Sequence, residues 1–343
     1  MKRVLIQSLC LRPVAAVNDK RIHEPHQRLA QIPGVEIRGG GRSIELDWRT
    51  DWDAKLFIWQ RPIMARGDDS VRKIKTLLKA GYVIVLEYDD YPERWPQHGD
   101  NDYLTFKGVH AIQTSTEALA AYFRPFNPEV RVFANQMLEV PPLPDRAPSE
   151  RLRIVFGALN RQDDWRELMP ALNAVLGTFP DQVEFQVIYD RAFYEALETS
   201  HKRFTPMCDY PVYLSALREA HIALLPLQDS RFNQYKSDLK FLECAACGTL
   251  ALASPTVYAQ TIQPERTGLL FKTPEELTAQ LTRVLLMPEL RGSIVNNAYR
   301  WVRAHRLLEQ HVQTRYDWYL ELAARRAELT PKLLRRHPLL MDA

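Results

Sequence analysis

Short runs of apolar residues alternate along this chain with longer stretches in which apolar residues recur every three or four positions. The short runs predict buried strands, and the longer stretches predict amphipathic helices. In the first part of the chain the predicted strands are 4–11, 35–38, 53–59, 82–86, 109–113 and 130–133, and the predicted helices are 21–32, 71–80 and 115–123. Strands and helices that alternate in this way predict a parallel sheet with helices on both faces.

A proline-rich, polar interval at 140–153 interrupts this alternation and predicts a linker between two domains. After it, strands are predicted at 154–158, 183–189, 222–227 and 249–254, and helices at 165–178, 213–220, 238–247, from 274, at 289–305 and at 308–328. We therefore expect a first domain at 1–140, a linker at 141–152 and a second domain at 153–307. The remaining segment, 308–343, is predicted to be a helix with a basic tail, for which packing back on the first domain is one option.

Both domains are predicted to be Rossmann-like, doubly wound α/β sheets. Such sheets bind ligands beyond the carboxyl ends of their strands, so we expect the ligand site in the cleft between the domains. The G-x-G-x-x-G fingerprint and the G-x-x-x-x-G-K-[ST] loop are absent, so hydride transfer and ATP hydrolysis lack their usual sequence support. The glycine triplet at 39–41 is predicted to be a flexible turn, with a phosphate cradle as the alternative.

Composition narrows the class of protein further. Of the 343 residues, 46% are hydrophobic and 25% are charged, and the net charge is +3, which is too small to favour nucleic acid as the main partner. No apolar run approaches the roughly 20 residues of a membrane span. The first apolar stretch contains Gln7 and Ser8 and lacks a small-residue cleavage site, so it predicts a strand and not a signal peptide. Four cysteines give no disulfide framework, and we expect a reducing, cytoplasmic location.

The stretch 234–254 contains the most informative predicted helix. Ser237 is expected to cap this helix and Gly248 to end it before the strand 249–254. Lys240 lies near the helix start, where a positive charge opposes the macrodipole. Either an anion binds there or Lys240 forms a solvated ion pair with Glu243, three residues on. The helix also carries a C-x-x-C pair, for which packing is favoured over redox or metal chemistry because no second pair stands at zinc spacing.

An acidic pair follows the predicted strand 82–86. Asp89 and Asp90 would lie at its carboxyl end, where one carboxylate, more plausibly that of Asp90, accepts a proton from a ligand or orients it. A metal site and a pair of turn caps are the alternatives. Arg21 and His23, at the predicted start of the first helix, are candidates for binding an acceptor or a phosphate, with a structural role equally open for His23.

Several segments resemble one known family in the same order along the chain. Lys240-Phe-Leu-Glu243, the small residues that end in Gly248, and the later Thr267-Gly-Leu-Leu are similar to the C-terminal signature of group 1 nucleotide-sugar glycosyltransferases of the GT-B fold. Further similar segments are 156–161, 114–117 with Asn135, and 83–90, so the resemblance covers nearly the whole chain. It implies two Rossmann-like domains, the first on the acceptor side and the second binding the nucleotide sugar.

The resemblance also implies roles for particular residues. Glu243 would bind the ribose hydroxyls, Arg161 and Lys240 would neutralise the diphosphate, and Asn160 would complete the donor site. Tyr210 and Tyr213 stand where the family seats its base, and stacking on the base and core packing are equally open for them. Pre-placed cations stabilise a diphosphate leaving group without a metal, so we expect no metal and no cofactor, with the nucleotide sugar as co-substrate. The acceptor would be a hydroxyl of a glycan, a lipid-linked saccharide or a protein, and the family often retains the anomeric configuration.

Two departures from the family keep other functions open. The family often carries a second glutamate eight residues before the first, where this chain has Tyr235, and the usual glycine pair after the first strand is missing. A nucleotide-sugar epimerase or hydrolase of the same fold, or a non-catalytic sugar-binding protein, is therefore an alternative. The tail 323–343 combines basic and leucine residues, which predicts either a solvated helix end or contact with an anionic membrane that carries the acceptor.

Overall fold

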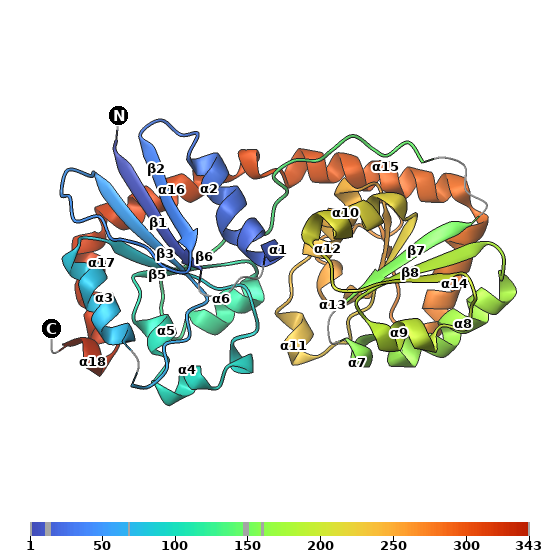
Figure 1. Cartoon of the computed structure of the whole chain (residues 1–343), viewed down its shortest axis with the longest axis horizontal. Helices are drawn as coiled ribbons and strands as arrows, with labels where there is room; N and C mark the ends of the chain where they lie inside the picture. Colours follow the sequence, from blue (N-terminus) through green and yellow to red (C-terminus); the bar gives the residue numbers. More distant parts are fainter. Residues whose placement is uncertain (1, 11–14, 68, 147–150, 159–160, 342–343) are drawn as a thin grey trace. The chain divides into compact units, whose positions relative to one another are not determined.

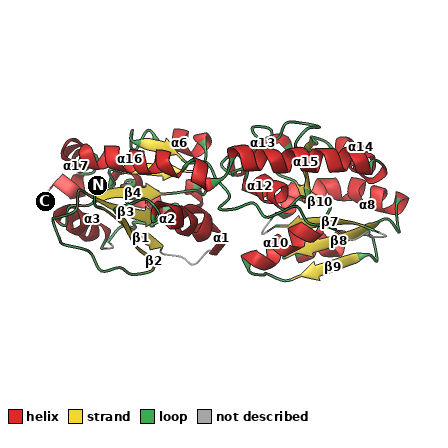
Figure 2. Ribbon diagram, turned by 90° about the horizontal axis from the view of Figure 1, so that it is seen from above, coloured by secondary structure: helices red, strands yellow, loops and turns green. Residues whose placement is uncertain are grey.

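The computed structural model describes residues 2–10, 15–67, 69–146, 151–158 and 161–341. The chain forms two compact units, Met1–Leu138 together with Leu308–Ala343, and Glu139–Leu307 (Figure 1). In each unit, helices lie on both faces of a sheet (Figure 2). Every strand pairing in both sheets is parallel.

The first unit contains a six-stranded sheet with the order β2-β1-β3-β4-β5-β6. Its strands are β1 (Val4–Cys10), β2 (Val35–Gly41), β3 (Ala54–Gln60), β4 (Val83–Glu87), β5 (Ala111–Thr114) and β6 (Val130–Val132). Its helices before the linker are α1 (Ala15–Asn18), η1 (Asp19–His23), α2 (Glu24–Leu29), α3 (Ser70–Lys79), η2 (Pro92–Arg94), α4 (Gln97–Asp100), α5 (Leu104–Lys107) and α6 (Glu117–Phe123).

The end of the chain completes this first unit. It contributes η4 (Leu308–Gln310), α16 (Val312–Ala324), α17 (Arg326–Arg335) and α18 (Pro338–Met341). Alternate residues of β1, β3 and β4, such as Ile6, Ile58 and Val85, share one buried cluster with Trp318 and Tyr319 of α16. The apolar stripe of α16 therefore seals one face of a sheet whose central strands are separated from it by more than 200 residues.

The second unit contains a sheet with the order β12-β11-β10-β7-β8-β9. Its strands are β7 (Leu152–Gly157), β8 (Val183–Ile188), β9 (Lys202–Thr205), β10 (Ile222–Leu225), β11 (Leu250–Ala253) and β12 (Leu269–Leu270). Its helices are α7 (Gln162–Trp165), η3 (Arg166–Leu168), α8 (Met169–Thr178), α9 (Arg191–Ala196), α10 (Tyr210–Glu219), α11 (Arg231–Gln234), α12 (Leu239–Ala246), α13 (Pro255–Tyr258), α14 (Pro274–Leu286) and α15 (Pro288–His305).

Two local predictions for the first unit were wrong, and one for the second unit. The glycine triplet is not a flexible turn but the end of β2, where a Cβ atom on Gly39 would lie 2.3 Å from the carbonyl oxygen of Ser8. Glycine is needed there because Gly39 and Gly40 have φ of 96° and 90° and the neighbouring backbone approaches closely. The first helical segment begins at Ala15, so Arg21 lies inside it and not at its start.

The helix predicted at 165–178 is divided into α7, η3 and α8, because Pro170 cannot donate a backbone hydrogen bond and occupies the first turn of α8.

Candidate functional site

The predicted helix 238–247 is present as α12, with one change at its start. Asp238, and not Ser237, is the N-cap residue, and Gly248 follows the helix with a φ of 70°, as expected of a glycine that ends a helix. The Asp238 carboxylate is fixed by Arg306 at 2.9 Å and by the Thr261 hydroxyl at 2.7 Å. The first turn of α12 is therefore held by both a cation and a neutral donor.

Glu243 on α12 is a buried carboxylate that accepts hydrogen bonds from two tyrosines of α10. Tyr210 donates to Oε1 at 2.8 Å and Tyr213 donates to Oε2 at 3.2 Å. The two rings are stacked, with centroids 6.1 Å apart and planes at 25°. Burial and the negative charge of Glu243 raise the pKa of Tyr213 well above its ordinary value, so this hydroxyl stays a donor. The carboxylate is thus held in one orientation.

Lys240 lies one helical turn before Glu243 and is half-buried. Its Nζ donates to the carbonyl oxygen of Gly157, at the carboxyl end of β7. Desolvation, together with repulsion from the nearby Arg161 guanidinium, lowers the pKa of Lys240 below its ordinary value. Two neighbouring cations that destabilise one another favour an anion between them.

Arg161 immediately precedes α7 and is held by side chains from two other segments. Its Nη1 donates to Asp164 Oδ2 at 3.1 Å and to Asn233 Oδ1 at 2.5 Å, and its guanidinium carbon lies 5.2 Å from the centre of the Phe232 ring. Asp164 in turn accepts from Asn233 Nδ2 at 2.6 Å. Sequence reasoning missed Asp164 and Asn233, because nothing in the sequence shows that α7 and α11 meet.

The two other residues predicted on the donor side are Asn160 and Tyr210. Asn160 lies outside the described residues. Tyr235, which stands where the family often has a glutamate, directly follows α11 and is half-buried. Tyr210, for which base stacking and core packing were the two expectations, directs its hydroxyl at Glu243. In the second unit the structure thus brings together Arg161, Lys240, Glu243 and Tyr210 through β7, α10 and α12.

A separate acidic cluster lies in the first unit, beyond the carboxyl ends of β3 and β4. Arg61 Nε contacts Asp89 Oδ1 at 2.6 Å, and Arg61 Nη1 lies 3.5 Å from Asp90 Oδ2. Burial opposes the charge of Arg61, but the two carboxylates outweigh it and raise its pKa. Arg61 has a φ of 43°, a conformation uncommon for residues other than glycine, and its amide donates to the Glu87 carbonyl. No motif or pattern in the sequence marks Arg61.

The two acceptor-side candidates of the first helical segment differ in exposure. Arg21 is 2% exposed and forms an ion pair with the fully buried Glu87 at 2.8 Å. It also donates to the Phe133 carbonyl at 2.7 Å and to Asn135 Oδ1 at 3.0 Å. His23 is exposed, and its ring lies against Gly40. The side chain of Arg21 thus joins η1 to β4 and to the segment after β6 within the unit.

Among the described residues, no group of three or more histidine, cysteine, aspartate or glutamate side chains is arranged to hold a metal ion. A search of the same residues finds no helix long and apolar enough to cross a membrane.

Part of the chain is similar to a known protein family. Residues 163–317 match the family model described as glycosyl transferase-like. This match covers most of the second unit, including α10, α11 and α12. The chain thus has the GT-B fold, and residues 163–317 are similar to the glycosyl transferase-like family.

Solved structures extend the likeness to the fold of the whole chain. Sucrose-phosphate synthase from Thermosynechococcus elongatus has a TM-score of 0.65 at 16% identity, with 94% of this chain and 100% of that chain covered. HepE from Anabaena, in complex with UDP and glucose, has a TM-score of 0.64 at 13% identity, with coverages of 92% and 99%.

The pneumococcal O-GlcNAc transferase GtfA, in complex with UDP and GlcNAc, has a TM-score of 0.59 at 10% identity, and its alignment spans 78% of this chain but 57% of GtfA. No curated protein sequence matches this chain significantly. These comparisons confirm the predicted GT-B fold and the predicted resemblance to nucleotide-sugar glycosyltransferases.

Proposed function

We propose that this GT-B protein transfers a hexosyl group from a UDP-sugar to a hydroxyl of a glycan, a lipid-linked saccharide or a protein. The observation that carries the proposal is the cluster of Arg161, Lys240 and Glu243, of which Lys240 and Glu243 lie in the segment that matches the glycosyl transferase-like family. UDP as the donor nucleotide is supported by HepE and GtfA, whose structures are described as complexes with UDP and a sugar.

Each donor-site residue then has a physical task. A carboxylate fixed by two tyrosine donors accepts hydrogen bonds from the two ribose hydroxyls, and charge-assisted hydrogen bonds are the stronger kind. The diphosphate lies near Arg161 and Lys240, where it relieves their mutual repulsion. Cleavage of the bond between sugar and diphosphate increases the negative charge on the leaving oxygen, and these pre-placed cations stabilise that charge without a metal.

On the acceptor side, we infer that Asp90 acts on the acceptor hydroxyl. Asp89 forms the shorter ion pair with Arg61, at 2.6 Å, which suits a structural role. Asp90 lies 3.5 Å from Arg61 and 3.9 Å from Arg94 and accepts from the Tyr91 amide at 2.9 Å. A carboxylate beyond the end of a strand is a suitable base or orienting group for a hydroxyl. Retention of the anomeric configuration is inferred from the family resemblance alone.

A thermal-shift screen against UDP-, GDP-, dTDP- and CMP-sugars tests the donor, because a ligand that binds only the folded state raises the melting temperature. We expect a shift with UDP-sugars that exceeds the others. Incubating the preferred donor with and without an acceptor panel then separates transfer from hydrolysis or isomerisation. No shift with any nucleotide sugar would reject the proposal, and the anomeric proton signals of the product would establish the stereochemistry.

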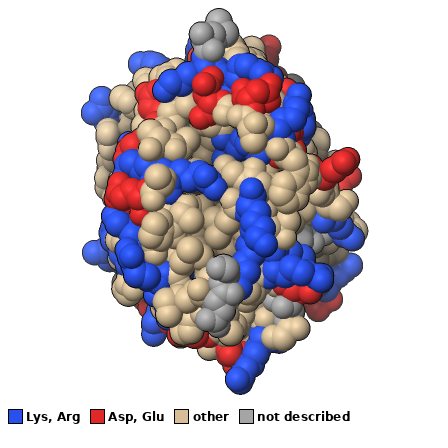
Figure 3. Space-filling view, turned by 90° about the vertical axis from the view of Figure 1, so that its left-hand side faces the viewer, with Lys and Arg blue, Asp and Glu red and all other residues tan. Residues whose placement is uncertain are grey.

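We further infer peripheral contact with an anionic membrane through the first unit. The tail does not project freely: Arg325 pairs with Glu129 at 2.6 Å, Arg326 donates to the Leu78 carbonyl and Arg336 donates to the Val109 carbonyl. Figure 3 shows many Lys and Arg side chains on the face of the molecule it views. Leu339 and Met341 of α18 are exposed. The exposed basic residues of α3 and α17 are Arg72, Lys73, Lys79, Lys332 and Arg335.

Basic side chains beside exposed apolar ones bind anionic lipid surfaces. Co-sedimentation with phosphatidylglycerol vesicles, but not with phosphatidylcholine vesicles, is the expected result, and equal sedimentation with both would reject this contact.

A further inference from the structure

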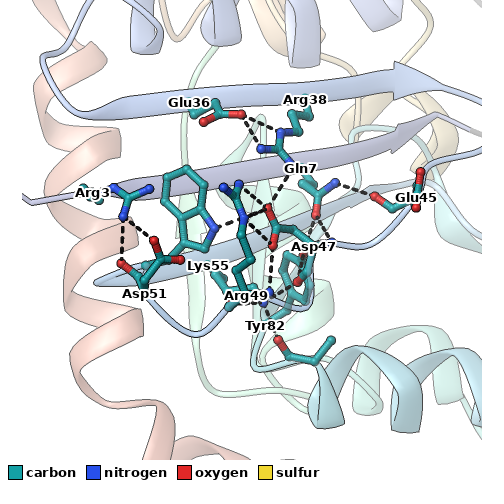
Figure 4. A network of polar contacts seen from close by, with 12 residues as sticks. Arg3, Gln7, Glu36, Arg38, Glu45, Asp47, Arg49, Asp51, Lys55 and Tyr82 are labelled. Carbon is teal, nitrogen blue, oxygen red and sulfur yellow. Dashed lines mark hydrogen bonds and ion pairs between the residues drawn. The ribbon is translucent and has the colours of Figure 1, made fainter.

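A cavity of about 500 Å³ lies over the β1–β2 edge of the first sheet. Its polar lining comes from Gln7 of β1, Arg38 of β2 and the segment between β2 and β3, and the exposed indole of Trp48 forms part of its wall. Figure 4 shows Arg38, Asp47 and Arg49 directed toward one another beside Gln7. None of these residues belongs to the donor-side or acidic clusters described above.

The segment that forms the cavity wall is fixed by buried side chains. The Lys55 ammonium donates to the carbonyl oxygens of Asp47, Arg49 and Ala80, the last at 2.6 Å. The Asp47 amide donates to the hydroxyl oxygen of Tyr82 at 2.9 Å. Because these buried contacts hold the main chain, the cavity is formed before any ligand arrives, which lowers the entropic cost of binding.

The lining combines the aliphatic Ile44 and Leu46 with polar side chains whose charges balance. Arg38 and Arg49 contact the Asp47 carboxylate at 2.9 Å and 2.6 Å, and Gln7 donates to the Glu45 carbonyl at 2.9 Å. The hydrogen bond from Arg49 holds the pKa of Asp47 well below its ordinary value, so the carboxylate stays ionised. The charged lining residues are two arginines and two acids, which favours an uncharged ligand over an anion.

Trp48 identifies the chemistry of that ligand. Its side chain is 59% exposed, although tryptophan is usually highly buried in proteins, and tryptophan is enriched where proteins bind other molecules. An indole face packs against the C–H face of a sugar ring, while arginine and carboxylate groups hydrogen-bond the hydroxyls around its edge. This combination suits a neutral saccharide better than a peptide or a nucleotide.

The cavity is well separated from the acidic cluster. Gln7, which lines the cavity, pairs with Phe57 of β3, whereas Arg61 directly follows the end of that strand. Four residues of extended strand span about 13 Å. A saccharide in the cavity would therefore lie more than one sugar ring away from one that contacts Asp89 or Asp90.

We propose that this cavity is a binding site for a neutral oligosaccharide, with Trp48 stacking on a sugar ring and with Arg38 and Arg49, which the buried Asp47 carboxylate holds, bonding its hydroxyls. The inference rests on the proposed function in one respect: the bound oligosaccharide would be a distant part of the acceptor chain. The binding itself is independent of transfer, and so is its test.

Maltohexaose, cellohexaose and chitohexaose are the probes, and calorimetry with the full chain is the measurement. At least one hexaose is expected to bind, and Trp48→Ala is expected to weaken this binding about tenfold or more, while Trp48→Phe retains part of it. Met207→Ala, a change at another exposed side chain, is the control and should have no effect. Unchanged melting temperatures establish that the variants are folded.

Two further comparisons separate this proposal from the proposed function. Glu243→Gln should lose donor binding but bind the hexaose as before, and Trp48→Ala should bind UDP as before. Three results would each overturn the site: no binding of any neutral hexaose at millimolar concentration, equal binding by Trp48→Ala, or binding of a sulfated heparin hexasaccharide alone.

Discussion

The hydroxyl of Tyr210 donates a 2.8 Å hydrogen bond to Oε1 of Glu243, while Tyr213 occupies the other oxygen of the same carboxylate at 3.2 Å. This arrangement orients the carboxylate but also occupies it in the absence of a ligand. Ribose hydroxyls must therefore either share the oxygens or displace a tyrosine, and the two tyrosines need not contribute equally.

We predict that the two tyrosines affect the protein differently. Tyr213 is half-buried and its hydroxyl is desolvated beside Glu243, so Tyr213→Phe leaves one carboxylate oxygen without its donor and should cost about 1–3 kcal/mol in the free energy of unfolding. Tyr210 makes the shorter hydrogen bond to the carboxylate and begins α10, so Tyr210→Phe should change stability less and UDP affinity by severalfold. Chemical denaturation and UDP calorimetry of both variants check this, and identical profiles for the two would contradict it.

The lowered pKa of Lys240 predicts how UDP binding depends on pH. Desolvation and the charge of Arg161 bring this pKa below the ordinary 10.5, so Lys240 loses its proton at a lower pH than an exposed lysine does. A diphosphate binds the protonated form, so affinity should be constant near neutrality and fall as pH rises through the lowered pKa. Calorimetry with UDP across the alkaline range measures this fall.

Lys240→Arg is the matched control for this prediction. Arginine keeps its charge in the same range, so its alkaline loss should disappear. Lys240→Met should weaken UDP binding at every pH but leave uridine binding nearly unchanged, because uridine lacks the diphosphate. A wild-type affinity that is flat up to the ordinary lysine pKa would contradict the assignment.

The acidic cluster predicts separate effects for its two aspartates. Asp90→Asn should lower kcat by roughly two orders of magnitude, the usual contribution of a positioned acid or base, with UDP affinity unchanged. Asp89→Asn breaks the 2.6 Å contact with Arg61 and should mainly lower stability. Steady-state kinetics with saturating donor and a melting curve for each variant distinguish them. Equal losses of kcat would show that the pair acts as one unit.

The buried pair of Arg21 and Glu87 predicts a large effect on stability. Removing one partner leaves an unpaired charge in the core, so Arg21→Met should cost about 3–5 kcal/mol in the free energy of unfolding. Arg21→Met combined with Glu87→Gln should cost less than the sum of the single changes. Urea denaturation tests both, and a stable Arg21→Met variant with a lost acceptor affinity would instead support the acceptor-side role.

The fold could be predicted from the sequence to a large extent because it depends on local patterns. Buried parallel strands appear as uninterrupted apolar runs, and the break at 140–153 is visible as composition. Positions that depend on contacts between distant segments could not be predicted. The glycine triplet looks like a turn until β1 and the ring of His23 are seen to pack against it.

Some residues of the candidate site could also be predicted from local patterns, whereas others depend on contacts between distant segments. Glu243, Lys240 and Arg161 could be predicted as candidates because a motif and a resemblance mark them. Asn233, Asp164 and Arg61 carry no such mark, because each acts on a residue from another element. Arg21 was expected to face a ligand, but the helical segment begins six residues earlier and the structure pairs the side chain with a buried glutamate.

Calorimetric titration of UDP into the wild-type chain and into Glu243→Gln tests the central claim most directly. The amide keeps the shape of the buried side chain and accepts from one tyrosine, so the variant should stay folded while losing the charge-assisted bonds to ribose, about 1.5–3 kcal/mol or some 10- to 150-fold in affinity. UMP and UDP should lose affinity by the same factor, because both contain the ribose. Equal UDP affinity for the wild type and a folded Glu243→Gln would contradict the account.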